Sequence, residues 1–161
     1  MKILGIDPGY DRCGVAIIEK KNGVHSLLYS NCIQTKKTQS FPDRLHIIGK
    51  EVRSIIKEWR PDALSVEKLF FFKNKKTAFL VAELRGVVIY EGACANVPFF
   101  EYTPLEIKET VAGHGHAEKK ELLKVLSYTI TLPKKRALDD EIDAIACALT
   151  CSYRERFALS T

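Results

Sequence analysis

Four acidic side chains stand where expected secondary-structure elements begin or end. Asp7 and Glu67 each follow a short apolar run that predicts a buried strand. Asp140 and Asp143 lie three residues apart at the start of an expected helix, which places their Cβ atoms about 5–6 Å apart on one helix face. Ligands of open α/β sheets gather beyond the carboxyl ends of the strands. Our hypothesis is therefore that the four carboxylates meet at one such edge.

Carboxylates gathered in this way repel one another unless cations hold them. Ligands that offer only oxygen atoms suit Mg²⁺ or Mn²⁺ rather than zinc. Two such ions about 4 Å apart can activate water and stabilise a leaving oxygen during cleavage of a phosphodiester. Taken singly, each acid also has a structural interpretation: Asp7 as a turn former, Glu67 as a solvated strand end, and the acids of the last helix as caps and partners of its dipole, namely Asp139, Asp140, Glu141 and Asp143.

An aromatic and basic run follows Glu67 closely, in Phe70-Phe71-Phe72-Lys73-Asn74-Lys75-Lys76. Three consecutive aromatic residues beyond the end of a strand cannot all enter one core. An exposed ring beside cations can stack on a nucleic-acid base, so Phe70, Lys73, Lys75 and Lys76 are candidate DNA contacts. The alternative is that the rings belong to the core or to an interface.

Two further basic segments could contact phosphate groups. Lys108 lies on a short helix, and the loop Gly113-His114-Gly115-His116 runs into the start of another helix, a place suited to anions. Lys119 could hold a phosphate there, with His114, His116 and Lys120 beside it. A third cluster, Lys134-Lys135-Arg136, precedes the acidic helix. A solvated loop and a solvated charge run remain alternative interpretations of these segments.

The remaining pattern predicts a mixed sheet. Strands are expected over 2–6, 13–18, 25–35, 63–66 and 97–102, and helices over about 41–59, 75–95, 103–113, from about 117, and 140–153. The short turns between the first three strands predict an antiparallel meander, whereas later strands separated by helices must pair in parallel through right-handed crossovers. Leu27 and Tyr29 are expected on one face of the third strand, and Phe79 in the apolar stripe of the long helix. The expected class is α/β, with helices on both faces of the sheet.

Composition narrows the possible functions. The 161 residues predict one domain spanning 1–161, and no apolar run or N-terminal pattern predicts a membrane span or a secretory signal, so we expect a cytoplasmic protein. A formal charge of +5 permits a nucleic-acid partner without requiring one. The five scattered cysteines argue against a disulfide framework or a zinc ribbon. Cys147 and Cys151 could share a metal, but small buried hydrophobic residues are the favoured interpretation.

An ordered set of motifs resembles one family over nearly the whole chain, the RuvC-type Holliday junction resolvases of the ribonuclease H-like superfamily. Gly-Ile-Asp-x-Gly alone does not identify the family, because actin-like ATPases and other ribonuclease H-like proteins carry it. The full set is specific: Gly-Ile-Asp-Pro-Gly at 5–9, Glu67 with Phe70, Ala-Glu-Leu-Arg-Gly at 82–86, Phe-Glu-Tyr at 100–102, the segment 108–119, and Asp-x-x-Asp at 140–143. The resemblance implies a ribonuclease H-like mixed five-stranded sheet, with three antiparallel strands followed by parallel ones.

The resemblance also implies roles for single residues. The metal-binding acids of the family match Asp7, Glu67, Asp140 and Asp143, and the cofactor implied is Mg²⁺, two ions per active site, with Mn²⁺ as a substitute. Lys119 matches a lysine needed near the cleaved phosphate, and Lys108 one implicated in catalysis or DNA contact. Phe70 matches an aromatic thought to stack on bases. Asp139 leaves a one-residue ambiguity that the helical spacing to Asp143 resolves in favour of Asp140.

The family's assembly implies further expectations. A homodimer would nick two strands of a four-way DNA junction symmetrically, in homologous recombination and DNA repair, on junctions delivered by a branch-migration complex of RuvA- and RuvB-type proteins. Two other classes stay open. An actin-like nucleotide binder would need two such domains, which 161 residues do not supply. A binding module without catalysis would gain by losing the acids that face phosphates, yet all four acids are present.

Overall fold

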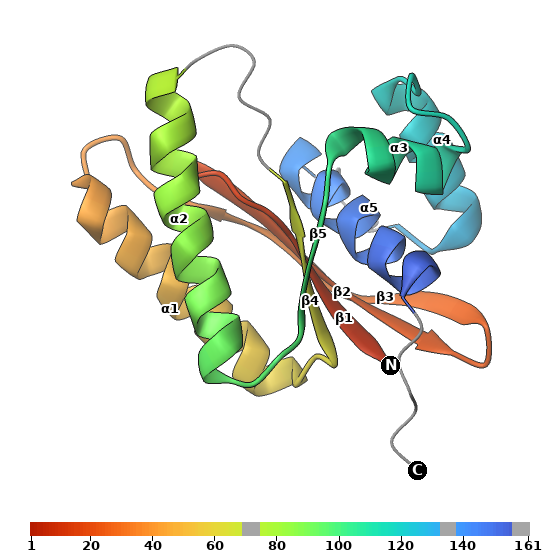
Figure 1. Cartoon of the computed structure of the whole chain (residues 1–161), viewed down its shortest axis with the longest axis horizontal. Coiled ribbons are helices and arrows are strands. Elements are labelled where there is room, and N and C mark those ends of the chain that lie inside the picture. The colour runs from red at the N-terminus through yellow and green to blue at the C-terminus, as the bar shows by residue number, and fades with distance from the viewer. Residues whose placement is uncertain (69–74, 133–137, 156–161) are drawn as a thin grey trace.

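Five strands form a sheet between two layers of helices in this computed structural model, which describes residues 1–68, 75–132 and 138–155, with the backbone alone at 75 and 76 (Figure 1). The strands are β1 (Lys2–Asp7), β2 (Arg12–Lys21), β3 (Val24–Gln34), β4 (Ala63–Glu67) and β5 (Phe99–Tyr102). The helices are α1 (Phe41–Trp59), α2 (Lys75–Cys94), α3 (Pro104–Ala112), α4 (Lys119–Thr129) and α5 (Asp139–Arg154). Helices α1 and α2 cover one face of the sheet, and α3, α4 and α5 lie on the other.

The sheet has the order β3-β2-β1-β4-β5, in which β1, β2 and β3 are antiparallel and β4 and β5 run parallel to β1. The predicted mixed α/β sheet is thereby confirmed. Asn22 and Gly23 both adopt positive φ, 52° and 80°, as a tight turn between two strands requires. The helix α1 then carries the chain across the sheet so that β4 can pair in parallel with β1.

Alternation along β1 divides its side chains between two cores. Leu4 and Ile6 pack with α1 and α2, whereas Ile3 belongs to the cluster built around α5. Because successive side chains of a strand point to opposite faces, Asp7 lies on the α5 face. The same alternation along β4 places Glu67 on the α5 face. Ser65, two residues before Glu67, lies on this face as well, and its hydroxyl donates to the backbone oxygen of Cys147 in α5 at 2.9 Å.

Two strand glycines allow α5 to lie directly on the sheet. A Cβ atom at Gly5 would overlap the backbone oxygen of Ala144, and one at Gly14 would overlap that of Asp140. A glycine inside a strand often marks such a close approach of another backbone segment. The first turn of α5 is therefore fixed against β1 and β2, near the ends of the strands that carry the acids.

Side-chain capping fixes the starts of α1 and α3. The hydroxyl of Ser40 accepts the N–H of Asp43 at the start of α1, and Arg60 ends that helix in the left-handed conformation. At the start of α3 a capping box is present, with Thr103 and Glu106 each accepting the other's backbone N–H, at 3.2 and 2.8 Å. Helix α4 begins at Lys119, two residues later than predicted.

Two predictions about side-chain faces are wrong. The pairing of Ile17 with Tyr29 and of Ile18 with Leu27 leaves Leu28 as an extra residue, so Leu27 packs on the α5 side while Tyr29 packs on the α1 side. A β-bulge of this kind reverses the alternation, which a strict period of two cannot anticipate. Phe79 is 69% exposed rather than packed in the core. No helix within the described ranges is both long and apolar enough to cross a bilayer.

Candidate active site

The parallel pairing of β1 with β4 brings Asp7 and Glu67 together. Ile6 pairs with Val66, and the two acids are the next residues along these neighbouring strands, on the same face of the sheet. Burial, followed by the charges of Glu67, Asp143 and Asp140, raises the pKa of Asp7 to about 8. Burial and the charge of Asp143 raise the pKa of Glu67 to about 7. These acids thus share a small and partly desolvated volume.

The first turn of α5 supplies the other two acids. Asp140 lies against Gly14 of β2 and has a side chain only 16% exposed, whereas the neighbouring Asp139 is 73% exposed. Burial raises the pKa of Asp143, although the charge of Lys119 opposes that rise. The geometry therefore favours Asp140 over Asp139 as the inward-facing carboxylate.

Capping of α5 falls to a different acid. The residue before the helix is Leu138, whose side chain has no oxygen atom, and Glu141 accepts its backbone N–H at 3.3 Å. Glu141 also accepts the hydroxyl of Ser30 at 3.0 Å. The structural interpretation of these acids as helix caps therefore applies to Glu141, and it leaves Asp140 and Asp143 unexplained by capping.

Each of the two inward-facing acids of α5 is paired with a cation. The Nζ atom of Lys119 lies 3.1 Å from Asp143 Oδ2 and 3.5 Å from Asp139 Oδ2. Burial alone would lower the pKa of Lys119, but Asp143 and Asp139 outweigh it and raise the pKa. Arg12, the first residue of β2, places its Nε atom 3.2 Å from Asp140 Oδ2. Asp7 and Glu67 are thus the less neutralised half of the acid cluster.

A pocket of about 260 Å³ opens beside the acids, lined by Glu67, Pro104, Ile107, Lys108, Lys119, Leu122 and Asp143. Lys108 reaches it from α3 and Lys119 from α4. Both positive charges act to lower the pKa of Glu67, against the larger effects of burial and Asp143. The pocket therefore presents carboxylates and ammonium groups together, as a site for a phosphate ester and its metal ions requires.

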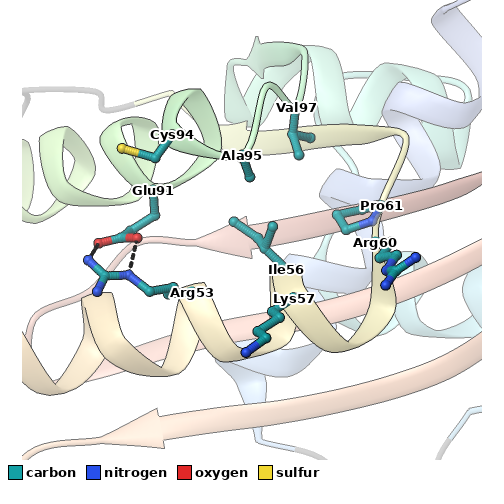
Figure 2. Close-up of a pocket in the computed structure, with 9 residues that line it drawn as sticks. All are labelled: Arg53, Ile56, Lys57, Arg60, Pro61, Glu91, Cys94, Ala95 and Val97. Carbon is teal, nitrogen blue, oxygen red and sulfur yellow. Dashed lines mark hydrogen bonds and ion pairs between the residues drawn. The ribbon is translucent and has the colours of Figure 1, made fainter.

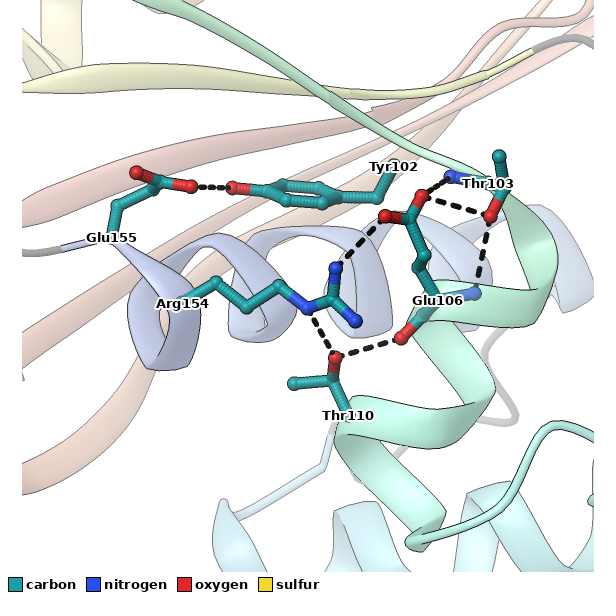
Figure 3. Close-up of polar contacts among 6 residues, drawn as sticks. All are labelled: Tyr102, Thr103, Glu106, Thr110, Arg154 and Glu155. Atoms are coloured by element: carbon teal, nitrogen blue, oxygen red, sulfur yellow. Dashed lines mark hydrogen bonds and ion pairs between the residues drawn. The ribbon is translucent and has the colours of Figure 1, made fainter.

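The position of Lys108 depends on contacts between α3 and the end of α5 (Figure 3). Arg154 of α5 donates from Nη1 to Glu106 at 2.9 Å and from Nε to the hydroxyl of Thr110 at 2.8 Å. The Tyr102 hydroxyl, from β5, donates to Glu155 at 2.9 Å. The helix that carries Lys108 is thereby fixed to the helix that carries two of the acids.

The donor set fits a divalent cation that prefers oxygen. Burial, and then the charges of neighbouring carboxylates, raise the pKa values of Asp7 and Glu67, and a bound dication would offset both effects. No three His, Cys, Asp or Glu side chains of the described residues already surround a single point as metal ligands would. Arg12 and Lys119 engage Asp140 and Asp143 instead.

The other candidate DNA contacts lie around this edge or outside the described residues. His114 is exposed and pairs with Glu121 at 3.0 Å, and His116 and Lys120 are exposed near the start of α4. Lys75 and Lys76 begin α2, where the structure describes the backbone alone. Phe70 and Lys73, together with the basic cluster at 134–136, lie outside the described residues.

Neither the cysteines nor a second pocket competes with this site. All five cysteines are free, and burial raises the pKa values of Cys147 and Cys151, that of Cys151 to about 12, so both are buried thiols. A larger pocket, of about 560 Å³, lies between the C-terminal parts of α1 and α2. Figure 2 shows Arg53 and Glu91 paired there through two hydrogen bonds of 2.7 Å. None of the candidate catalytic residues lines it.

The fold and the acidic edge define a ribonuclease H-like protein with a carboxylate site. A family model described as "Crossover junction endodeoxyribonuclease RuvC" matches residues 3–151. A protein of that name from Petrotoga mobilis is 43% identical over 148 residues, covering 92% of this chain and 91% of the relative. Another from Thermosipho melanesiensis is 39% identical over 157 residues, covering 98% and 100%.

Solved structures agree with the sequence comparison. The structure of Thermus thermophilus RuvC in complex with a Holliday junction substrate matches with a TM-score of 0.89 at 30% identity, covering 95% of this chain and 93% of that one. The yeast mitochondrial Holliday junction resolvase Ydc2 matches with a TM-score of 0.68 at 13% identity, a likeness of fold alone. The chain belongs to the RuvC family.

Sequence reasoning missed Arg12 and Cys32. Arg12 contacts Asp140, and the Cys32 thiol lies 3.9 Å from the same carboxylate oxygen. Neither residue stands in a recognisable motif. The available signal was Gly14, whose place inside a strand indicates close approach by another segment and so points to β2 and its neighbour β3 as part of the site.

Proposed function

We propose that this protein is a structure-selective endonuclease that resolves four-way DNA junctions by paired, symmetric nicks in homologous recombination and DNA repair. The observation that carries the proposal is the meeting of Asp7 and Glu67 with the first turn of α5, in surroundings that raise the pKa values of two of these acids. The names of the relatives, and the junction bound to the Thermus thermophilus protein, support this choice of substrate.

The proposed catalytic set consists of four acids and one lysine. Asp7, Glu67, Asp140 and Asp143 would hold two Mg²⁺ ions, for which Mn²⁺ would substitute, and the ions would supply water activation and stabilisation of the leaving oxygen. Lys119 would place its ammonium group on the phosphate, because it already lies at hydrogen-bond distance from Asp143 and lines the same pocket.

Around this set, Lys108, Lys120, His114 and His116 are the proposed contacts of the DNA backbone. Lys108 lines the pocket, and the other three stand exposed near the start of α4. Phe70 and Lys73, which lie outside the described residues, and Lys75 and Lys76 at the start of α2 remain predicted contacts. Stacking by Phe70 would favour the opened bases of a junction over the closed bases of a duplex.

The proposed working unit is a homodimer, and the exposed side of α2 supports it. Phe79 and Tyr90 are 69% and 62% exposed, and the exposed Glu83 and Gly86 lie between them at helical spacing. A helix of a monomer normally turns polar residues to solvent, so the two exposed aromatic rings of α2 are suited to contact with a second copy of the chain. Two copies would supply the two active sites that paired nicking needs.

The cellular setting of the proposal follows from its substrate. Four-way junctions form where bacterial DNA recombines, so we propose that the protein acts in the cytoplasm. Delivery of junctions by RuvA- and RuvB-type proteins is proposed on family likeness.

A synthetic four-way junction with Mg²⁺ tests the proposal directly. We expect paired nicks at symmetric positions, no cutting in EDTA, and no cutting of a linear duplex of the same sequence. Asp7→Asn should abolish cutting and keep junction binding, because it removes one metal ligand and no DNA contact. Equal nicking by a carefully purified Asp7→Asn variant would refute the assignment, and binding without any cutting by the unaltered protein would favour a non-catalytic junction-binding module.

A further inference from the structure

Arg12 is held against the candidate metal site by the shape of the chain on either side of it. The turn that follows Asp7 is tight, since a Cβ atom at Gly9 would overlap the backbone oxygen of Arg12. Two residues after Arg12, Gly14 touches the first turn of α5. The guanidinium therefore reaches the carboxylate of Asp140, with Nε 3.2 Å from Oδ2.

The pair is unequal in its exposure. The side chain of Arg12 is 53% exposed, whereas that of Asp140 is 16% exposed. The arginine can therefore move into solvent, while the carboxylate stays fixed on α5. The Cys32 thiol approaches the same oxygen from β3, at 3.9 Å. Oδ2 of Asp140 is thus engaged from two strands.

A guanidinium and a metal ion compete for the same carboxylate. A dication that binds Asp140 must displace Arg12 or share the oxygens with it, and the nearby positive charge opposes its arrival. Lys119 stands in the same relation to Asp143, but it already has a proposed role at the phosphate. Arg12 has no other acidic partner among the described residues.

We propose that Arg12 is a positioning residue of the metal site. It holds Asp140 while the site lacks metal, and it leaves the carboxylate when a dication binds, which frees its guanidinium for a phosphate of the bound DNA. The inference rests on the proposed function, because it takes Asp140 to be a metal ligand. It adds a residue that the family motifs do not include.

Metal affinity measured without DNA tests whether Arg12 competes with a dication for Asp140. Mn²⁺ binding, followed by the loss of the free-ion electron paramagnetic resonance signal, should be about two- to fivefold tighter in Arg12→Gln than in the unaltered protein, the range expected for a half-exposed ion pair. Arg12→Lys should lie between the two. Lys36→Gln is the matched control: it removes one positive charge from an exposed residue just past Gln34, the partner of Arg12 in β3, and its affinity should not change.

The outcomes separate the inference from the proposed function. Mn²⁺ binding by Arg12→Gln that is equal to or weaker than that of the unaltered protein would overturn the role of Arg12. An increase in Mn²⁺ affinity of the same size in Lys36→Gln would show a general effect of charge, and it would also overturn that role. Absence of Mn²⁺ binding by the unaltered protein would instead overturn the proposed function. A misfolded variant would lose affinity, so a gain cannot come from structural damage.

Junction binding tests whether the displaced Arg12 contacts a phosphate of the bound DNA. Ca²⁺ in place of Mg²⁺ suits this measurement, since its longer and more flexible coordination favours binding over the strict geometry of cleavage. With Ca²⁺, the slope of log affinity against log salt should be smaller by about 0.9 in Arg12→Gln, which corresponds to one phosphate contact. In EDTA the two proteins should have the same slope, because Arg12 stays on Asp140. Equal slopes in Ca²⁺ would refute release of Arg12 to the DNA.

Discussion

Replacing Asp7 by asparagine should stabilise the metal-free protein at alkaline pH. In the folded chain the pKa of Asp7 is raised from 3.8 to about 8, first by burial and then by Glu67, Asp143 and Asp140. A carboxyl whose pKa rises on folding binds its proton more tightly in the folded state. Its contribution to stability is therefore complete below pH 3.8 and is lost as the pH rises toward 8.

The size of the effect follows from the same shift. One unit of pKa corresponds to about 1.4 kcal/mol, so an isolated shift of this size would represent about 6 kcal/mol. The neighbouring acids titrate together with Asp7, and part of the shift belongs to the cluster as a whole. We therefore expect Asp7→Asn to raise the unfolding free energy at pH 8.5 by about 2 kcal/mol. For a chain of this length, this corresponds to an unfolding temperature higher by about 4–8 °C.

Thermal unfolding in EDTA at pH 5, 6.5 and 8.5 measures this effect. The unaltered protein should lose stability along the series, and Asp7→Asn should lose less, so that the variant is the more stable protein at pH 8.5. Mg²⁺ should then restore stability to the unaltered protein and have little effect on the variant. Glu51→Gln, which removes an exposed acid on α1, serves as the control and should follow the unaltered protein. An Asp7→Asn variant that is less stable at pH 8.5 would refute the reasoning.

Three further predictions address catalysis, packing and assembly. Lys119→Met should slow single-turnover cleavage by about a hundredfold or more while junction binding in gel shifts changes little, because the lysine lies beside Asp143 and the pocket; an unchanged rate would remove it from the catalytic set. Gly14→Ala should lower the unfolding free energy in urea by about 2–3 kcal/mol, because its Cβ atom would overlap the backbone of Asp140; a stability equal to that of the unaltered protein would show that α5 can retreat freely. Phe79→Asp combined with Tyr90→Asp should convert a dimer into a monomer in sedimentation velocity, and a variant that remains dimeric would place the interface elsewhere.

Local rules were sufficient for most of the fold and for the position of the acids. Strand ends can be read from apolar runs that stop at Asp7 and Glu67, and the capping of α3 from Thr103 and Glu106, because these signals act within a few residues. The contact between Arg12 and Asp140 joins residues far apart in the chain, and no local pattern encodes it. The bulge at Leu28 and the exposure of Phe79 likewise depend on neighbours that a single sequence does not reveal.

The same small residues that close the core also position the candidate site. Alternation allows only every second residue of β1 and β4 to face α5, and these positions hold Gly5 before Asp7 and Ser65 before Glu67. Larger side chains at Gly5 or Gly14 would lift α5 from the sheet and carry its acids away from Asp7. The charge cluster is therefore a consequence of packing, and a change in the α5 contact should alter metal affinity even when all four acids are intact.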